Sequence, residues 1–184
     1  METKMKKFTI LLCTLFLVSC SNDEAAESEI VDNAGTIERL DPRLDALIPA
    51  GANIQKLAGG FTFTEGPVWD RRNNLLYFSD VRDNTIYSWS EDSGVRIFIQ
   101  PVYAEATDHP SVGSNGLTLD REGRLVLMEH GYRRVSRLEA NGERTPLVDN
   151  YRGNRLNSPN DVAWHSNGWI YFTDPPYGMA GLEN

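Results

Sequence analysis

Oxygen-bearing side chains recur at three corresponding places in this sequence: Glu65 in EGPVW, Asn115 in SNGLTL and Asn160 in NSPNDVAW. Carboxylate and amide oxygens bind hard divalent cations such as Ca²⁺. The same residue types also close turns, and a loop glutamate is ordinarily solvated. Asp161 follows Asn160, and because adjacent strand residues point to opposite faces, we expect Asp161 to form structural hydrogen bonds. For the other three residues, the ligand and turn hypotheses depend on the elements that position them.

Each of these three residues opens one copy of a repeat. The copies are EGPVWDRRNNLLYFSD, NGLTLDREGRLVLMEH and NDVAWHSNGWIYFTD. Each contains two strand-like runs around a polar turn, and two more strands around a Gly-containing turn are predicted in NTIYSWSEDSGVRIFIQP and RRVSRLEANGERTPLVDN. The copies are spaced by about the 40 to 50 residues of a four-stranded propeller blade. The sequence therefore predicts an all-β fold, a β-propeller, with a β-sandwich as the alternative.

The predicted propeller occupies residues 61–184. This length suffices for about two and a half to three blades, whereas propellers close with about four to eight. We therefore expect the chain to be the N-terminal part of a longer protein, truncated at its C-terminus. Residues 37–60, which begin IERLDPRLDALIP, are expected to form a short helical or turn-like lead-in. Residues 20–36 are small, polar and acidic, which indicates a flexible tether.

Residues 1–19 have the features of a lipoprotein signal peptide. Three lysines precede the apolar run FTILLCTLFLV, and LVSC, which ends at Cys20, matches the bacterial lipobox. Cys20 is thus the predicted lipidation site. The other cysteine, Cys13, lies in the part that would be removed, so no disulfide is expected. The predicted location is the bacterial cell envelope, with a lipid anchor in a membrane and the protein facing the periplasm or the cell exterior.

The charge of the chain excludes some classes of partner. The net charge is −8, and removal of the lysine-containing signal peptide would make it more negative. An acidic surface repels nucleic acid and anionic lipid headgroups. We expect no nucleic acid partner, and we expect membrane attachment through the lipid on Cys20 rather than through a basic patch.

Three groups of motifs resemble one known family. EGPVW, SNGLTLDREGRL with EHGYRRVSRL, and NSPNDVAWHSNGWIYFTDPPYG are similar to the gluconolactonase branch of the SMP-30/gluconolactonase/luciferin-regenerating-enzyme family, from about Leu57 to Gly178. The resemblance implies a six-bladed propeller with a divalent metal, usually Ca²⁺, in its central channel. It further implies that Glu65 and Asn160 are metal ligands, that Glu65 is a candidate general base, and that the remaining ligands come from blades beyond residue 184.

Other residues are candidates for contact with a substrate. Asn115 faces the same channel and either binds substrate or closes a turn. His109, in the loop EATDHPSVGSNG, is expected to overhang the channel mouth, and Tyr177 in the rigid DPPYG turn is expected near it. His130 stands where the other two copies have aspartate, which predicts a turn cap rather than an acid or base. His165 is expected to be an exposed turn residue.

The resemblance implies hydrolysis of a sugar lactone, such as an aldonolactone, with the metal polarising the carbonyl. The sequence contains no G-x-S-x-G motif, so a serine hydrolase mechanism has no support. The absence of a Cys or His cluster argues against zinc. The alternative is a non-catalytic surface lipoprotein propeller that binds a carbohydrate or a protein partner, with any metal purely structural.

Overall fold

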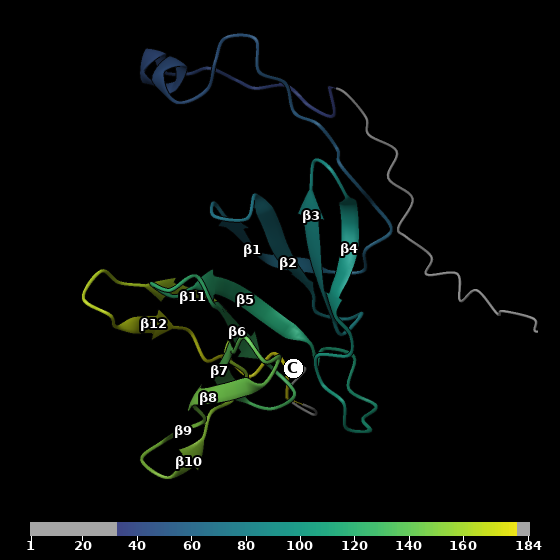
Figure 1. Ribbon diagram of the computed structural model, residues 1–184, viewed down its shortest axis with the longest axis vertical. Helices are drawn as coiled ribbons and strands as arrows, with labels where there is room; N and C mark the ends of the chain where they lie inside the picture. Colours follow the sequence, from purple (N-terminus) through teal and green to yellow (C-terminus); the bar gives the residue numbers. More distant parts are fainter. Residues whose placement is uncertain (1–32, 180–184) are drawn as a thin grey trace, which may run out of the picture.

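The computed structural model describes residues 33–179, and its strands form two four-stranded sheets and part of a third (Figure 1). The first sheet contains β1 (Thr64–Asp70), β2 (Leu75–Asp80), β3 (Thr85–Ser90) and β4 (Gly94–Ile99). The second contains β5 (Ser114–Leu119), β6 (Leu125–Glu129), β7 (Arg134–Leu138) and β8 (Arg144–Val148). Within each sheet the strands follow one another in chain order and pair antiparallel. This order is that of a propeller blade.

Short elements complete the description. β11 (Val162–Trp164) pairs with β12 (Ile170–Phe172) as the beginning of a third blade, and β9 (Asn150–Tyr151) pairs with β10 (Asn154–Arg155) as a small hairpin. The lead-in segment contains one 3₁₀ helix, η1 (Pro42–Ala46). Asp41 caps this helix, because its carboxylate accepts a hydrogen bond from the backbone N–H of Arg43 at 2.8 Å. The predicted fold, an all-β partial propeller, is confirmed.

The turns form where the sequence places residues that tolerate a left-handed backbone. Asn74, between β1 and β2, has a φ of 52°, and Asn84, between β2 and β3, has a φ of 55°. Gly123 has a φ of 86° in the corresponding turn between β5 and β6. The predicted turns EDSG and EANGE join β3 to β4 and β7 to β8, so both predicted strand pairs are present.

Two apolar layers hold the three sheets together. Tyr77 and Ile86 of the first sheet pack against Leu117 and Leu127 of the second. On its other side the second sheet packs against the third through a layer that consists of Val126, Met128, Val135, Leu147, Val148, Val162, Trp164 and Phe172. All five residues of β6 are buried because both faces of its sheet are covered. This explains why residues 125–128, LVLM, are a continuous apolar run instead of an alternating one.

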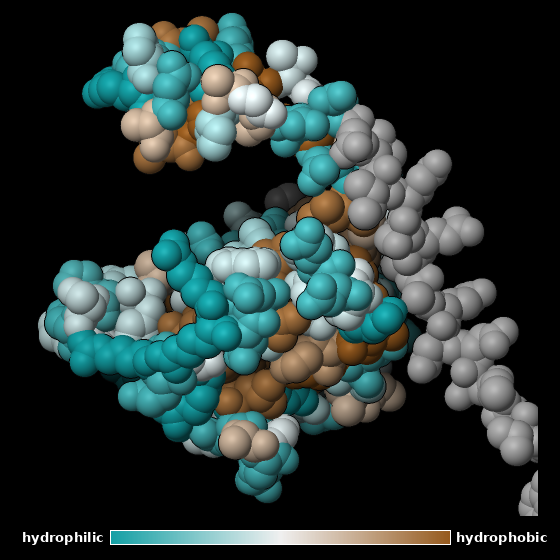
Figure 2. All heavy atoms as spheres, turned by 45° about the horizontal axis from the view of Figure 1, so that its top comes forward, coloured by the Kyte–Doolittle hydropathy of each residue, from teal (hydrophilic) through white to brown (hydrophobic). Residues whose placement is uncertain are grey.

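The outer faces of the first and third sheets have no neighbouring sheet among residues 33–179. Trp69 and Ile97 of the first sheet remain 45% and 52% exposed, and Trp169 and Tyr171 of the third remain 65% and 54% exposed. Figure 2 shows hydrophobic residues on the surface of the body, below the separate lead-in segment. Phe61, which directly follows the lead-in, contacts the first sheet through its ring, whose centroid lies 5.1 Å from that of Phe78. Residues 33–179 thus form an open arc of blades.

The predicted signal peptide, the lipidation site Cys20 and most of the predicted tether lie outside the described residues. Between residues 33 and 179, no helix has the length and apolar composition needed to cross a membrane.

Candidate functional site

The three repeat starts converge at one end of the sheets. The N–H of Gly116, next to Asn115, donates a hydrogen bond to the backbone oxygen of Asn160 at 2.7 Å. The hydroxyl of Ser79, which pairs with Glu65 across β1 and β2, donates to the backbone oxygen of Asn115 at 2.8 Å. The segments that begin with Glu65, Asn115 and Asn160 are therefore neighbours, as expected for the innermost strands of consecutive blades.

Two glycines permit this close approach, and their role was not anticipated from the sequence. A Cβ atom on Gly66 would lie 2.3 Å from the backbone oxygen of Asn115, and the φ of Gly66 is +55°. A Cβ atom on Gly116 would lie 2.5 Å from the backbone oxygen of Asn160. No side chain fits at either position without a shift of the neighbouring backbone. The signal was present in the sequence, since EG and NG open the first two copies of the repeat.

The side chains at the three starts have oxygens available for a ligand. Asn115 is only 5% exposed, and Glu65 and Asn160 are half-buried. Within residues 33–179, no hydrogen bond or ion pair engages the carboxylate of Glu65 or the side-chain amides of Asn115 and Asn160. A carboxylate with amide oxygens suits a hard cation in type. These three side chains alone are too few to supply the about six to eight oxygen ligands that Ca²⁺ takes. Residues 33–179 also contain no group of three or more His, Cys, Asp or Glu that could hold a metal ion.

The turn chemistry around Asn160 is also present. Its N–H donates to the backbone oxygen of Thr173 at 2.9 Å, which anchors the segment before β11 to the segment after β12. The carboxylate of Asp161 accepts a hydrogen bond from the N–H of Val162 at 2.8 Å. The Ser158 hydroxyl accepts a hydrogen bond from the N–H of Gly178 at 2.8 Å, so NSPND and DPPYG form one unit. This arrangement fixes the backbone that carries the Asn160 side chain.

In each repeat, the residue at or directly after the end of the second strand forms hydrogen bonds with the loop that precedes the first strand. Asp80 accepts hydrogen bonds from the N–H groups of Thr62 and Phe63 at 2.6 and 3.0 Å. Asp174 accepts one from the N–H of Asn157 at 2.8 Å. His130 makes the corresponding hydrogen bond as the donor, whereas the two aspartates are acceptors. Its Nδ1 lies 3.3 Å from the backbone oxygen of Ser111, and a carbonyl oxygen can only accept.

His130 lines a pocket of about 300 Å³ at the same end of the second sheet. The other lining residues include Tyr103, Thr107, His109, Arg133 and Gly178. His130 is 2% exposed, and burial, together with the neighbouring His109, lowers the pKa of its imidazole below the ordinary value. The imidazole is therefore neutral at physiological pH.

The predicted substrate residues lie in different surroundings. His109 lines the pocket of His130, whereas Tyr177 is 68% exposed and is not among the residues that line that pocket. Glu65 lines a separate pocket of about 420 Å³ between the outer face of the first sheet and the lead-in segment 55–58. His165 is exposed in the turn between β11 and β12.

A buried ion cluster surrounds the last residue of β6, next to His130. The carboxylate of Glu129 is fully buried and forms ion pairs with Arg134 and Arg144. Both guanidinium groups also lie over the ring of Tyr132, at 4.6 and 5.4 Å from its centroid. Arg144 donates a further hydrogen bond to the backbone oxygen of Val102 at 2.7 Å, which connects the second sheet to the loop that follows β4. Because Glu129 precedes His130, this cluster fixes the end of β6.

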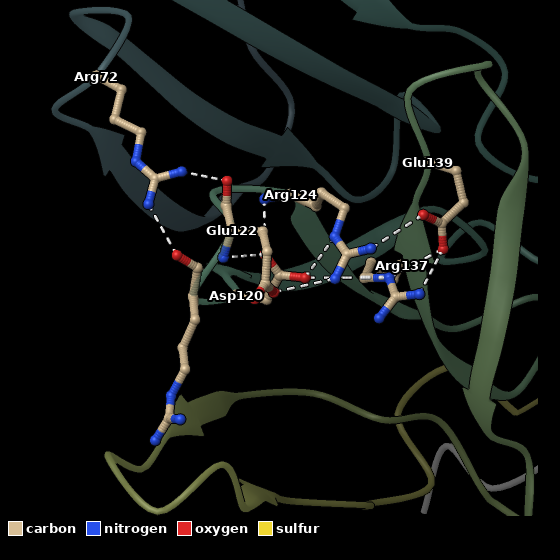
Figure 3. A network of polar contacts seen from close by, with 7 residues as sticks. Arg72, Asp120, Glu122, Arg124, Arg137 and Glu139 are labelled. Atoms are coloured by element: carbon tan, nitrogen blue, oxygen red, sulfur yellow. Dashed lines mark hydrogen bonds and ion pairs between the residues drawn. The ribbon is translucent and has the colours of Figure 1, made fainter.

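A second polar network lies at the opposite end of the blades (Figure 3). Arg124 connects Asp120 at 2.7 Å with Glu139 at 3.4 Å, and hydrogen bonds from Arg137 lower the pKa of Glu139. Arg72, from the turn between β1 and β2, reaches across to the backbone oxygen of Glu122. This network connects the first two blades and contributes no residue to the candidate site.

The comparisons with known proteins agree with the predicted resemblance. The model of the "SMP-30/Gluconolactonase/LRE-like region" matches residues 63–183. A gluconolactonase of Zymomonas mobilis is 38% identical over 154 residues, which are 81% of this chain and 43% of that protein.

Two solved structures share the fold over most of this chain. The solved structure of a gluconolactonase from Xanthomonas campestris is 32% identical, with a TM-score of 0.71, over 86% of this chain and 50% of its own. Another structure assigned to the gluconolactonases is 39% identical, with a TM-score of 0.68, over 78% of this chain and 47% of its own. The chain thus spans at most about half the length of these relatives.

Proposed function

Because the chain belongs to the SMP-30/gluconolactonase/LRE-like family, we propose that it supplies the first half of a lactone-hydrolysing site whose substrate is a sugar lactone. The observation that carries this proposal is the convergence of Glu65, Asn115 and Asn160 at one end of the sheets, brought about by Gly66 and Gly116. The similarity to gluconolactonases supports the reaction class.

The proposed roles follow from side-chain chemistry. Glu65 and Asn160 would hold a divalent cation. Both offer oxygen donors and neither offers sulfur or imidazole, so the pair suits Ca²⁺ better than zinc. When bound, such a cation supplies Lewis-acid polarisation of the lactone carbonyl and a nucleophilic water at neutral pH. Glu65 is also the candidate base that takes a proton from the attacking water. Asn115, which is buried, would orient the substrate through its amide group.

The reaction is balanced without any other reactant. Water adds to the carbonyl carbon of the lactone, the bond from that carbon to the ring oxygen breaks, and the ring oxygen takes a proton to become a hydroxyl. The product is an aldonic acid, which releases one proton at neutral pH. Proton release therefore measures turnover directly.

Metal dependence is tested by chelation. The product of the whole reading frame that contains these 184 residues is incubated with D-glucono-1,5-lactone before and after treatment with EDTA. We expect EDTA to abolish the enzyme-dependent proton release and Ca²⁺ to restore it. Hydrolysis that persists after complete removal of divalent ions would contradict the metal part of the proposal, while the absence of any hydrolysis would contradict the proposed reaction.

We propose further that the protein is attached to the membrane of a bacterial cell envelope by a lipid on Cys20. The support is the sequence pattern of residues 1–20, in which a basic start and an apolar run precede LVSC. The chain would then meet its substrate in the periplasm or at the cell exterior.

A further inference from the structure

One buried polar atom beside the candidate site has no partner among the described residues. It is Nε2 of His130, which is buried and forms no hydrogen bond in the part of the chain from 33 to 179. A buried polar atom without a partner costs about 1–3 kcal/mol, so such atoms are rare in folded proteins and deserve an explanation. The proposed roles of Glu65, Asn115 and Asn160 make no use of this atom.

The surrounding backbone determines which proton His130 carries. Its Nδ1 lies 3.3 Å from the backbone oxygen of Ser111, and a carbonyl oxygen only accepts, so the proton resides on Nδ1. The ring is neutral because it is buried. It follows that Nε2 has a lone pair and is a hydrogen-bond acceptor. The ligand that satisfies it must bring an O–H or N–H donor, and a carboxylate cannot do so.

The repeats show that this acceptor is not needed for the fold. Asp80 and Asp174 occupy the corresponding positions in the other two repeats and accept hydrogen bonds from the loops that lead into their first strands, Asp80 through both carboxylate oxygens and Asp174 through Oδ2. Oδ1 of Asp174 is buried and, like Nε2 of His130, has no hydrogen-bond partner within residues 33–179. In the second repeat the loop is tied by Nδ1 of His130, and the same ring carries Nε2 in addition. A histidine at this position thus makes the hydrogen bond to the loop through Nδ1, and its Nε2 remains as a second, unused acceptor.

The acceptor is next to both the pocket and the repeat starts. His130 lines the pocket of about 300 Å³ together with His109. The N–H of His130 donates to the backbone oxygen of Gly113 at 3.1 Å, two residues before Asn115. On the other side, a Cβ atom on Gly178 would lie 2.9 Å from Nδ1 of His130, so the DPPYG turn packs directly against the ring.

We propose that His130 is a substrate-contacting residue, whose Nε2 accepts a hydrogen bond from a hydroxyl group of a polyhydroxylated, uncharged ligand in this pocket. The inference rests on the proposed function in one respect, because it identifies that ligand with the hydroxyl-bearing part of the sugar lactone. An acceptor at this place favours the neutral lactone, which carries several hydroxyl donors, and gives no attraction to the carboxylate of the product.

Two substitutions of His130 test the roles of its two ring nitrogens separately. In His130→Asn, the side-chain NH₂ replaces Nδ1 and can still donate to Ser111, but the acceptor is lost. In His130→Gln, the longer side chain places an oxygen near the position of Nε2 and loses the tie to Ser111. His165→Asn is the matched control, because His165 is an exposed turn histidine.

The probe is D-glucitol, a polyol that cannot be hydrolysed, and its binding is measured by calorimetry with the product of the whole reading frame. We expect His130→Asn to weaken binding by about tenfold, in line with one lost hydrogen bond, and His130→Gln to weaken it less. His165→Asn should bind like the wild type. Equal affinity of the wild type and His130→Asn, or no binding of D-glucitol to the wild type, would overturn the inference.

A measurement on the wild type keeps the test decisive if a variant fails to fold. Long-range ¹H–¹⁵N NMR distinguishes the two ring nitrogens, and we expect a protonated Nδ1 and an unprotonated Nε2 whose signal moves when D-glucitol is added. A protonated Nε2, or a signal that does not move, would contradict the inference. If D-glucitol binds as expected but no lactone is hydrolysed, the hydroxyl site stands and the proposed reaction fails. If the lactone is hydrolysed but His130→Asn binds D-glucitol normally, only this inference fails.

Discussion

Gly116 controls how closely the start of β5 approaches the segment before β11. Its Cβ position lies 2.5 Å from a backbone oxygen, which cannot rotate away as a side chain would. We expect Gly116→Ala to lower the free energy of unfolding by about 1–3 kcal/mol through overpacking. Denaturant unfolding measures the change.

The matched control for this substitution is Gly51→Ala. No atom lies within 4 Å of the Cβ position of Gly51, and its φ is not in the left-handed region. This variant should unfold like the wild type. Equal stability of both variants would show that the two inner segments separate at no cost, and the convergence of the repeat starts would then lose its structural basis.

Glu129 is the second residue whose substitution should have a large effect. Its carboxylate is fully buried between two arginines that are about one fifth exposed. Glu129→Gln removes the negative charge and leaves two guanidinium groups without their partner, so we expect a loss of about 3 kcal/mol in the free energy of unfolding. Glu122→Gln, at a carboxylate that is 66% exposed, should change it by no more than about 0.5 kcal/mol. Similar results for the two variants would show that the buried cluster adds no stability.

The sequence indicated which segments of the candidate site are neighbours, but not what surrounds them. Glu65, Asn115 and Asn160 could be identified because the repeat places them in equivalent positions. His130 was expected to cap a turn, and it does tie down a loop, but its unpartnered Nε2 was not predictable. That atom is defined by Ser111 and by the DPPYG turn, which are distant in sequence and are brought together by the packing of adjacent blades.

At the level of elements, the turns of adjacent blades are joined by arginines. Arg72, in the turn between β1 and β2, donates to the backbone oxygens of Arg121 at 2.8 Å and of Glu122. Arg121, in the turn between β5 and β6, in turn donates to the backbone oxygen of Ser166 in the turn between β11 and β12. An arginine in each of the first two of these turns thus contacts the turn of the next blade.

We expect Arg72→Gln to lower the free energy of unfolding by about 1 kcal/mol, because hydrogen bonds from a charged donor are lost at a partly exposed place. Arg71→Gln is the control, since Arg71 is the adjacent exposed arginine and makes no such contact within residues 33–179. Denaturant unfolding compares the two. Equal stability of these variants would mean that the arginine contacts do not hold the blades together.

The loop tied by His130 gives the protein a predictable pH dependence. Burial lowers the pKa of this histidine in the folded state, while His109 and Arg133 line the same pocket. Below the unfolded-state pKa of 6.5, the unfolded chain binds a proton that the folded chain does not, so stability falls as the pH decreases. The fall is at most about 1.4 kcal/mol per pH unit and ends at the lowered folded-state pKa.

We expect His130→Asn to flatten this slope and His165→Asn to leave it unchanged. Urea unfolding at about pH 7.5, 6.5 and 5.5 covers the window in which an ordinary histidine becomes charged. A slope that is the same in the wild type and in His130→Asn would show that this histidine does not titrate differently in the two states.

The strands were predictable because each copy of the repeat places apolar runs between turn residues. The lead-in was harder, since its apolar residues have an irregular spacing. Only Pro42–Ala46 form a helix there, and Leu40 and Leu47 remain 83% and 81% exposed. No sheet covers these two leucines among the described residues, so their apolar side chains do not stabilise a longer helix by packing.

At the level of the whole molecule, the predicted lipid anchor can be tested with the two cysteines of the sequence. We expect Cys20→Ser to move the protein from the membrane fraction to the soluble fraction, because no lipid can be attached. Cys13→Ser should remain in the membrane fraction, since Cys13 lies in the part that is removed. Cell fractionation with mass spectrometry of the N-terminal peptide measures both. A membrane-bound Cys20→Ser variant would contradict the anchor.

If the repeat starts form part of a lactone-hydrolysing site, hydrolysis should depend on the carboxylate of Glu65. The measurement is the initial rate of proton release from D-glucono-1,5-lactone by the product of the whole reading frame, at constant pH and with Ca²⁺ present. We predict that Glu65→Gln lowers the enzyme-dependent rate by about a hundredfold. Glu91→Gln, at an exposed glutamate in the turn between β3 and β4, should keep the wild-type rate. An unchanged rate in Glu65→Gln would contradict the account.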